Sequence, residues 1–116
     1  MNSHRRLSAW GTAQQLVAMV YDLTAGLDAS ERYVVVPQLR RAAWSVLNNI
    51  AEGNAKLGHG EQRRAFDCSL GSLAELDAMI GTLVRMKTVE PAWEERFEGM
   101  RRSITAAIFK LLRNRH

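Results

Sequence analysis

The chain has 116 residues, of which 47% are hydrophobic, and this is enough for one packed domain and too much for a disordered segment. No apolar run approaches the roughly 20 residues needed to cross a bilayer, and no signal-peptide core follows the N-terminal residues, so we expect a cytoplasmic, single-domain protein over residues 1–116. The charge is basic, with 16 Lys and Arg against 12 Asp and Glu, and the single cysteine excludes an internal disulfide or a cysteine-based metal cluster.

The first predicted helix runs from about residue 8 to residue 25. Apolar side chains recur along it at intervals of three and four, which is the spacing of one helix face. Gly26 follows the last of them and is typical of a C-terminal stop. The residues assigned to the buried stripe are Trp10, Leu16, Val17, Val20, Tyr21, Leu23 and Thr24.

The second predicted helix covers residues 35–54. Pro37 fits only in its first turn, where the missing N–H is not needed, and Gly53 is interpreted as the stop. The predicted core face is Leu39, Ala42, Ala43, Val46 and Ile50. The opposite face is Arg41, Ser45, Asn48 and Glu52. This polar row is either a solvated surface or a hydrogen-bond network between subunits.

The third predicted helix covers residues 61–87, after a glycine-rich loop at residues 53–60. Its apolar positions alternate by threes and fours, as in the seam of a helical bundle. The seam residues are Phe66, Ser69, Leu73, Leu76, Ile80 and Leu83. Cys68 lies inside this helix and is interpreted as an inert core thiol rather than a reactive one.

Asp77 is the unusual residue of the third helix. It falls only about 20° from Phe66 on the helical wheel, which predicts a carboxylate among apolar neighbours. An unpaired buried carboxylate is costly, so we expect an arginine partner, with Arg40 or Arg41 as the candidates. A structural ion pair is favoured over a catalytic acid.

Residues 88–91 turn the chain, and the fourth predicted helix covers residues 92–114. Its core stripe is Trp93, Phe97, Met100, Ile104, Ala107 and Leu111. No strand-like alternation competes with these helices. Four helices with short connections predict an all-α fold, an antiparallel up-down four-helix bundle.

Three of the helices carry more apolar surface than one bundle needs. The apolar arc of the second helix covers roughly 200°, whereas a core-facing stripe needs little more than about 100°. A second strip on the third helix contains Cys68, Met79 and Met86. Scattered exposed apolar residues are normal, but large exposed patches usually mark interfaces. We therefore predict a homo-oligomer with Trp44, Ala51 and Phe109 at subunit contacts.

The C-terminal segment, residues 99–116, contains no acid. Its cations are Arg101, Arg102, Lys110, Arg113 and Arg115. Phe109 lies among them, and arginines interleaved with an aromatic ring can hold a phosphate backbone and stack a base. This pattern predicts a nucleic-acid-binding surface, with a solvated basic face as the alternative.

No catalytic or metal-binding constellation is evident. The three histidines are His4, His59 and His116. None is at ligand spacing from another histidine or cysteine, and no glycine loop of the phosphate-cradling type is present. We predict no enzyme activity, no metal and no cofactor. A catalytic interpretation would require Asp77, Glu75 or Glu52 in a cleft with another titratable group.

Five segments resemble the four-helix-bundle family of 23S rRNA intervening-sequence proteins. They are Tyr21–Thr24, Glu31–Tyr33, Gln38–Ala43, Asn49–Gly53 and Gly71–Glu75. The resemblance covers about residues 10–112 and implies a bacterial cytosolic bundle that assembles as a ring-shaped homopentamer. The polar residues assigned structural roles are Arg41, Asn49, Glu52, Glu75 and Asp77.

The sequence thus predicts a non-enzymatic homo-oligomer, pentameric by resemblance, that binds RNA or DNA through an arginine-rich surface. The alternative is a protein-interaction scaffold or accessory subunit without direct nucleic-acid contact, whose partner meets Trp44 or Phe109. No membrane contact and no small-molecule substrate are expected.

Overall fold

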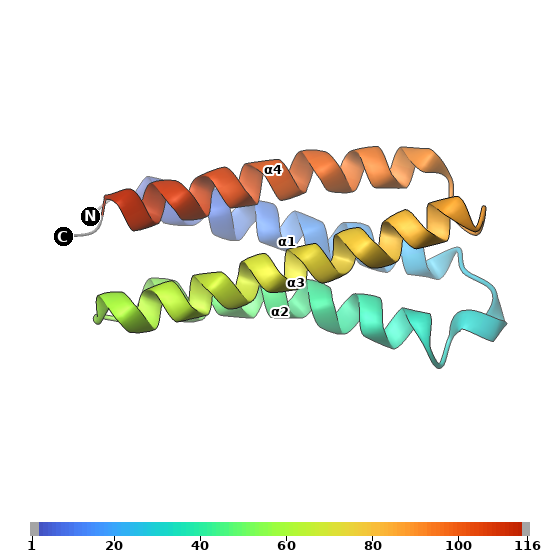
Figure 1. Ribbon diagram of the computed structural model, residues 1–116, viewed down its shortest axis with the longest axis horizontal. Helices are drawn as coiled ribbons and strands as arrows, with labels where there is room; N and C mark the ends of the chain where they lie inside the picture. Colours follow the sequence, from blue (N-terminus) through green and yellow to red (C-terminus); the bar gives the residue numbers. More distant parts are fainter. Residues whose placement is uncertain (1–2, 115–116) are drawn as a thin grey trace.

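The computed structural model describes residues 3–114, and their side chains from Ser8 onward. These residues form four α-helices, with one short 3-10 turn in the first connection (Figure 1). The elements are α1 (Ser3–Ala25), η1 (Ala29–Glu31), α2 (Val35–Ala55), α3 (His59–Arg85) and α4 (Pro91–Arg113). The predicted all-α four-helix fold is confirmed.

Successive helices run in opposite directions along a body of 47 × 23 × 18 Å (Figure 1). Each helix packs against its two neighbours in the cyclic order α1, α2, α3, α4, with the most extensive contact between α2 and α3 and the least between α3 and α4. The start of α1, the α2–α3 link and the end of α4 lie together at one end (Figure 1). We call this the terminal end, and the end with the other two links the far end. No helix among the described residues is long and apolar enough to span a bilayer.

The core is built from one stripe on each helix. The predicted seams of α2 and α3 are buried throughout, and Phe66 and Phe97 are the largest fully buried side chains. In α1 the predicted stripe is partly wrong, because Trp10 and Tyr21 are 41% and 38% exposed. Both lie more than about 100° around the helix from Leu16, the centre of the buried side. Core positions not predicted on α1 are Ala9, Ala13 and Met19.

Gly53 has a different role from the predicted helix stop. Helix α2 continues past it to Ala55, and the predicted glycine-rich loop shrinks to residues 56–58. Gly53 is buried against Phe66 of α3, where an added Cβ would lie 2.5 Å from the ring atom Cε1. A glycine is therefore required here for close approach of α2 and α3.

The other helix ends follow local rules. Helix α3 ends at Arg85, two residues earlier than predicted, and Lys87 takes the left-handed conformation with φ 61°. The amide of Lys87 donates to the carbonyl of Val84 at 3.0 Å, and that of Thr88 donates to Leu83 at 2.9 Å. This pair of bonds is the Schellman motif, which satisfies the last carbonyls of the helix.

Candidate nucleic-acid interface

Cations from two helices lie at the terminal end. The last turns of α4 carry Lys110 and Arg113, which are both exposed. Helix α3 begins at the same end and contributes Arg63 and Arg64, also exposed (Figure 1). This second pair was not predicted, although the predicted antiparallel order already placed the start of the third helix and the end of the fourth at one end. We call these four residues the basic cluster.

The terminal end also carries acidic residues, namely the exposed Glu52, Glu61 and Asp67. Lys56 in the α2–α3 link is shared by Glu52 and Glu61, at 3.8 and 3.9 Å. Within the part of the chain that the structure describes, no acidic side chain forms an ion pair with Lys110 or Arg113. Their charges are therefore available to an external anion.

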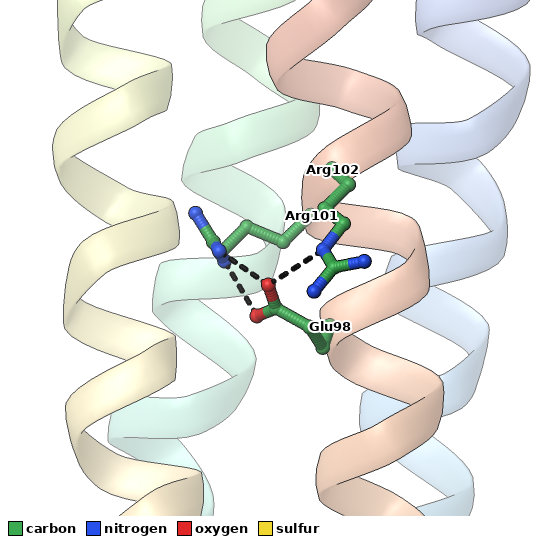
Figure 2. A network of polar contacts seen from close by, with 3 residues as sticks. All are labelled: Glu98, Arg101 and Arg102. Atoms are coloured by element: carbon green, nitrogen blue, oxygen red, sulfur yellow. Dashed lines mark hydrogen bonds and ion pairs between the residues drawn. The ribbon is translucent and has the colours of Figure 1, made fainter.

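Arg101 and Arg102 differ from Lys110 and Arg113, because both donate hydrogen bonds to the Glu98 carboxylate (Figure 2). Arg101 donates through Nε at 2.8 Å and through Nη2 at 2.5 Å to the two carboxylate oxygens, and Arg102 donates through Nε at 3.0 Å. The hydrogen bond from Arg101 is the main cause that lowers the pKa of Glu98 from 4.5 to about 2, with Arg102 adding to it. The same hydrogen bond raises the pKa of Arg101.

The five cations predicted to bind nucleic acid thus fall into three groups. Lys110 and Arg113 lie in the basic cluster, whereas Arg101 and Arg102 are occupied by Glu98. Arg115 lies outside the described residues. A carboxylate held by three N–H groups reduces the capacity of this arginine pair to take a phosphate.

The predicted buried ion pair of Asp77 is wrong. Asp77 is exposed, and it borders a shallow hollow of about 450 Å³ between α3 and α4. The other lining residues are Glu94, Glu95, Glu98, Gly99 and Arg102. The helical wheel gave the correct side of α3, but α3 and α4 share the least extensive contact of the bundle, so solvent reaches the carboxylate.

Arg40, one of the two arginines proposed to pair with Asp77, belongs instead to the outer face of α1 and α2. Its guanidinium carbon lies 4.2 Å from the centroid of the Tyr21 ring, and its Nε donates to Thr24 Oγ1 at 3.1 Å. Trp44 is 42% exposed and donates from Nε1 to the Tyr21 hydroxyl at 3.0 Å. These contacts tie the aromatic residues of α1 and α2 together at the surface.

The polar row of α2 divides into two parts. Ser45 forms the first part. Its carbonyl accepts a hydrogen bond from Asn49 at 2.9 Å, and its Oγ accepts one from the Ser72 hydroxyl of α3 at 2.7 Å. This cluster joins α2 to α3. The remaining members, Arg41, Asn48 and Glu52, are exposed.

Two other positions on α3 are also exposed. Glu75 lies at the surface, and so does Cys68, so the predicted core location of the thiol is wrong. Cys68 follows the buried Phe66 by two residues, which places it on the opposite side of the helix. Among the described residues, no three or more His, Cys, Asp or Glu side chains are grouped where they could hold a metal ion.

An apolar groove of about 310 Å³ lies at the far end, between the start of α2 and the end of α3. Its apolar lining includes Val34, Val35, Met79, Leu83 and Met86. Part of the second apolar strip predicted on the third helix, Met79 and Met86, therefore lines this groove.

The fold and the charged end together define a small, all-helical four-helix bundle with a basic end. The family model described as 23S rRNA-intervening sequence protein matches residues 5–111, and the chain belongs to this family. The predicted resemblance is confirmed.

One solved structure shares nearly the whole fold. It is a protein with unknown function from the S23 ribosomal protein family of Bacteroides thetaiotaomicron, with 14% sequence identity and a TM-score of 0.84. The match covers 95% of this chain and 99% of the other. At this identity the likeness shows the fold alone. A comparison with curated proteins gives no match.

Proposed function

We propose that the protein is a non-enzymatic, homo-oligomeric bundle that binds RNA or DNA through arginine-rich surface at its terminal end. The observation that carries the proposal is the basic cluster, in which α3 adds Arg63 and Arg64 to Lys110 and Arg113 of α4. Guanidinium groups bind phosphate through two parallel N–H donors, so a group of exposed arginines favours a phosphate backbone. In this proposal Arg101 and Arg102 are secondary contacts, because Glu98 competes for them.

The proposed self-association uses the outer face of α1 and α2. Trp44 and Ala51 are exposed on α2, and the exposed Trp10 and Tyr21 of α1 extend the patch. Trp10 and Tyr21 are eleven residues apart, which returns the chain to within about 20° of the same side of a helix. A pentamer, as the family resemblance implies, would repeat the basic cluster around a symmetry axis and multiply its field.

Fluorescence anisotropy with labelled RNA and DNA oligonucleotides tests the nucleic-acid part. We expect binding at about 50 mM salt that weakens by at least tenfold at about 200 mM, because phosphate contacts release counterions. Absence of binding at low salt, or an affinity independent of salt, would refute it.

Static light scattering tests the self-association. The wild-type protein should give the mass of an oligomer, and Trp44→Arg should lower that mass by placing a charge in the contact. A wild-type monomer at micromolar concentration is the adverse result.

The alternative function, a protein-interaction scaffold, is favoured by a separate observation. The groove at the far end exposes Val34 and Met86, which are 60% and 62% accessible. A scaffold of this kind predicts no nucleic-acid binding at low salt, so the anisotropy titration separates the two proposals.

A further inference from the structure

Phe109 is an exposed aromatic residue at the basic end of the bundle. Its side chain is 47% exposed in the closing turns of α4, whereas Ile108 and Leu111 beside it are buried. It lies on the same side of α4 as Glu98 and Arg102, both of which border the hollow shared with α3. Phe109 therefore lies on the α3–α4 side of the bundle, whereas Trp44 contacts Tyr21 on the α1–α2 side.

Two cations follow Phe109 on α4. Lys110 is the next residue, and Arg113 follows four residues later, which is about 6 Å farther along the same side. Both are exposed.

The antiparallel register adds a cation from α3. An added Cβ on Gly81 would lie 3.1 Å from Glu94 Oε2, so these two residues face each other across α3 and α4. The two helices are antiparallel and have the same rise per residue. Moving from this pair toward the terminal end along both helices therefore places the turn that contains Arg63 opposite the turns of Phe109 and Arg113.

An exposed ring among phosphate-binding cations suits a single strand better than a duplex. Every base has a face that can stack on an aromatic ring, but a base in a duplex is already stacked between its neighbours. For an all-helical fold, reading the major-groove base edges of a duplex would require a helix to enter that groove, which is about 12 Å wide. Helix α4 is flanked by α1 and α3, which leaves only its outer side free for such contact.

We infer that Phe109 is a stacking platform for a base of single-stranded nucleic acid, whose adjoining phosphates bind Lys110, Arg113 and Arg63. The inference rests on the proposed function and names its substrate class. It assigns Phe109 to the nucleic-acid site rather than to the subunit contact that its exposure alone predicts.

The test measures binding of the full-length protein to a labelled oligothymidine of about 20 nucleotides and to the matching thymidine–adenosine duplex. Phe109→Ala and Phe109→Leu should each weaken single-strand binding by about fivefold or more, because both remove the ring. Phe109→Trp should retain it. All three variants should bind the duplex within about twofold of wild type. Leu57→Ala is the matched control, because Leu57 is 92% exposed at the same end and has no ring.

Three results would overturn the inference. Wild-type affinity in Phe109→Leu would show that apolar volume, not stacking, matters, and an equal loss on the duplex would remove the single-strand preference. A lower mass of Phe109→Ala in light scattering would return Phe109 to a subunit contact. Failure of the proposed function is distinct, because the wild-type protein would then bind neither probe in a salt-dependent way.

Discussion

Replacing Gly53 with alanine tests the packing of α2 on α3. The new Cβ would lie 2.5, 2.7 and 3.1 Å from Cε1, Cδ1 and Cζ of the Phe66 ring, which is fully buried. Overpacking of this kind costs about 1–3 kcal/mol, whereas Gly to Ala inside a helix returns up to about 1 kcal/mol. Because the contact is severe, we place the overpacking cost near the upper end of its range. The expected net loss is about 1–2 kcal/mol in the free energy of unfolding.

Thermal and urea unfolding measure this change, with all variants at one protein concentration because assembly contributes to stability. Gly53→Ala should lower Tm by roughly 4–12 °C. Gly71→Ala is the matched control: Gly71 lies inside α3 with nothing within 4 Å of an added Cβ, and its replacement should raise stability by about 0.5–1 kcal/mol. Adding Phe66→Leu to Gly53→Ala should cost less than the sum of the single changes. Equal stabilisation by Gly53→Ala and Gly71→Ala would refute the close-approach argument.

Two further predictions concern the helix ends and the Glu98 cluster. Lys87→Gly should stabilise the fold by about 0.5–1 kcal/mol in urea unfolding, because φ 61° is strained for lysine, and a loss would contradict the Schellman assignment. The pKa of Glu98 is lowered from 4.5 to about 2, so its stabilising pairs are present above pH 4.5 and are lost as the pH falls toward 2. Wild type should therefore lose more stability than Glu98→Gln between those pH values. At neutral pH the same variant should bind oligonucleotides more tightly by freeing Arg101 and Arg102, and weaker binding would show that Glu98 orients this pair for the ligand.

Periodicity predicted the helices and most of the core, because apolar spacing directly reports which side of a helix is buried. Periodicity gave a wrong prediction where a side chain tolerates both burial and exposure to solvent. Trp10 and Tyr21 are large and apolar but carry polar atoms, and both lie at the edge of the buried side of α1. Gly53 illustrates a second limit, since a glycine that ends a helix and one that admits a neighbouring ring look alike in sequence.

The candidate site was harder to predict than the fold, since it depends on tertiary contacts. The helical wheel placed Asp77 on the correct side of α3. It could not show how loosely α4 packs against α3. The acid-free C-terminal segment predicted Lys110 and Arg113, and the predicted antiparallel order could have added Arg63 from the start of the third helix. The pairing of Arg101 with Glu98 was open to prediction, since the two residues are three apart on one helix.

The central claim is that the terminal end binds nucleic acid. It is tested most directly by comparing two variants that carry the same double charge reversal, one at each end of the bundle. Lys110→Glu with Arg113→Glu reverses two cations of the basic cluster, and Arg32→Glu with Arg85→Glu makes the same change among exposed residues at the far end. In anisotropy titrations, the terminal-end variant should lose at least about tenfold in affinity and about two units of salt slope, whereas the far-end variant should stay within about threefold of wild type. Equal losses in the two variants, or wild-type affinity in the terminal-end variant, would contradict the claim.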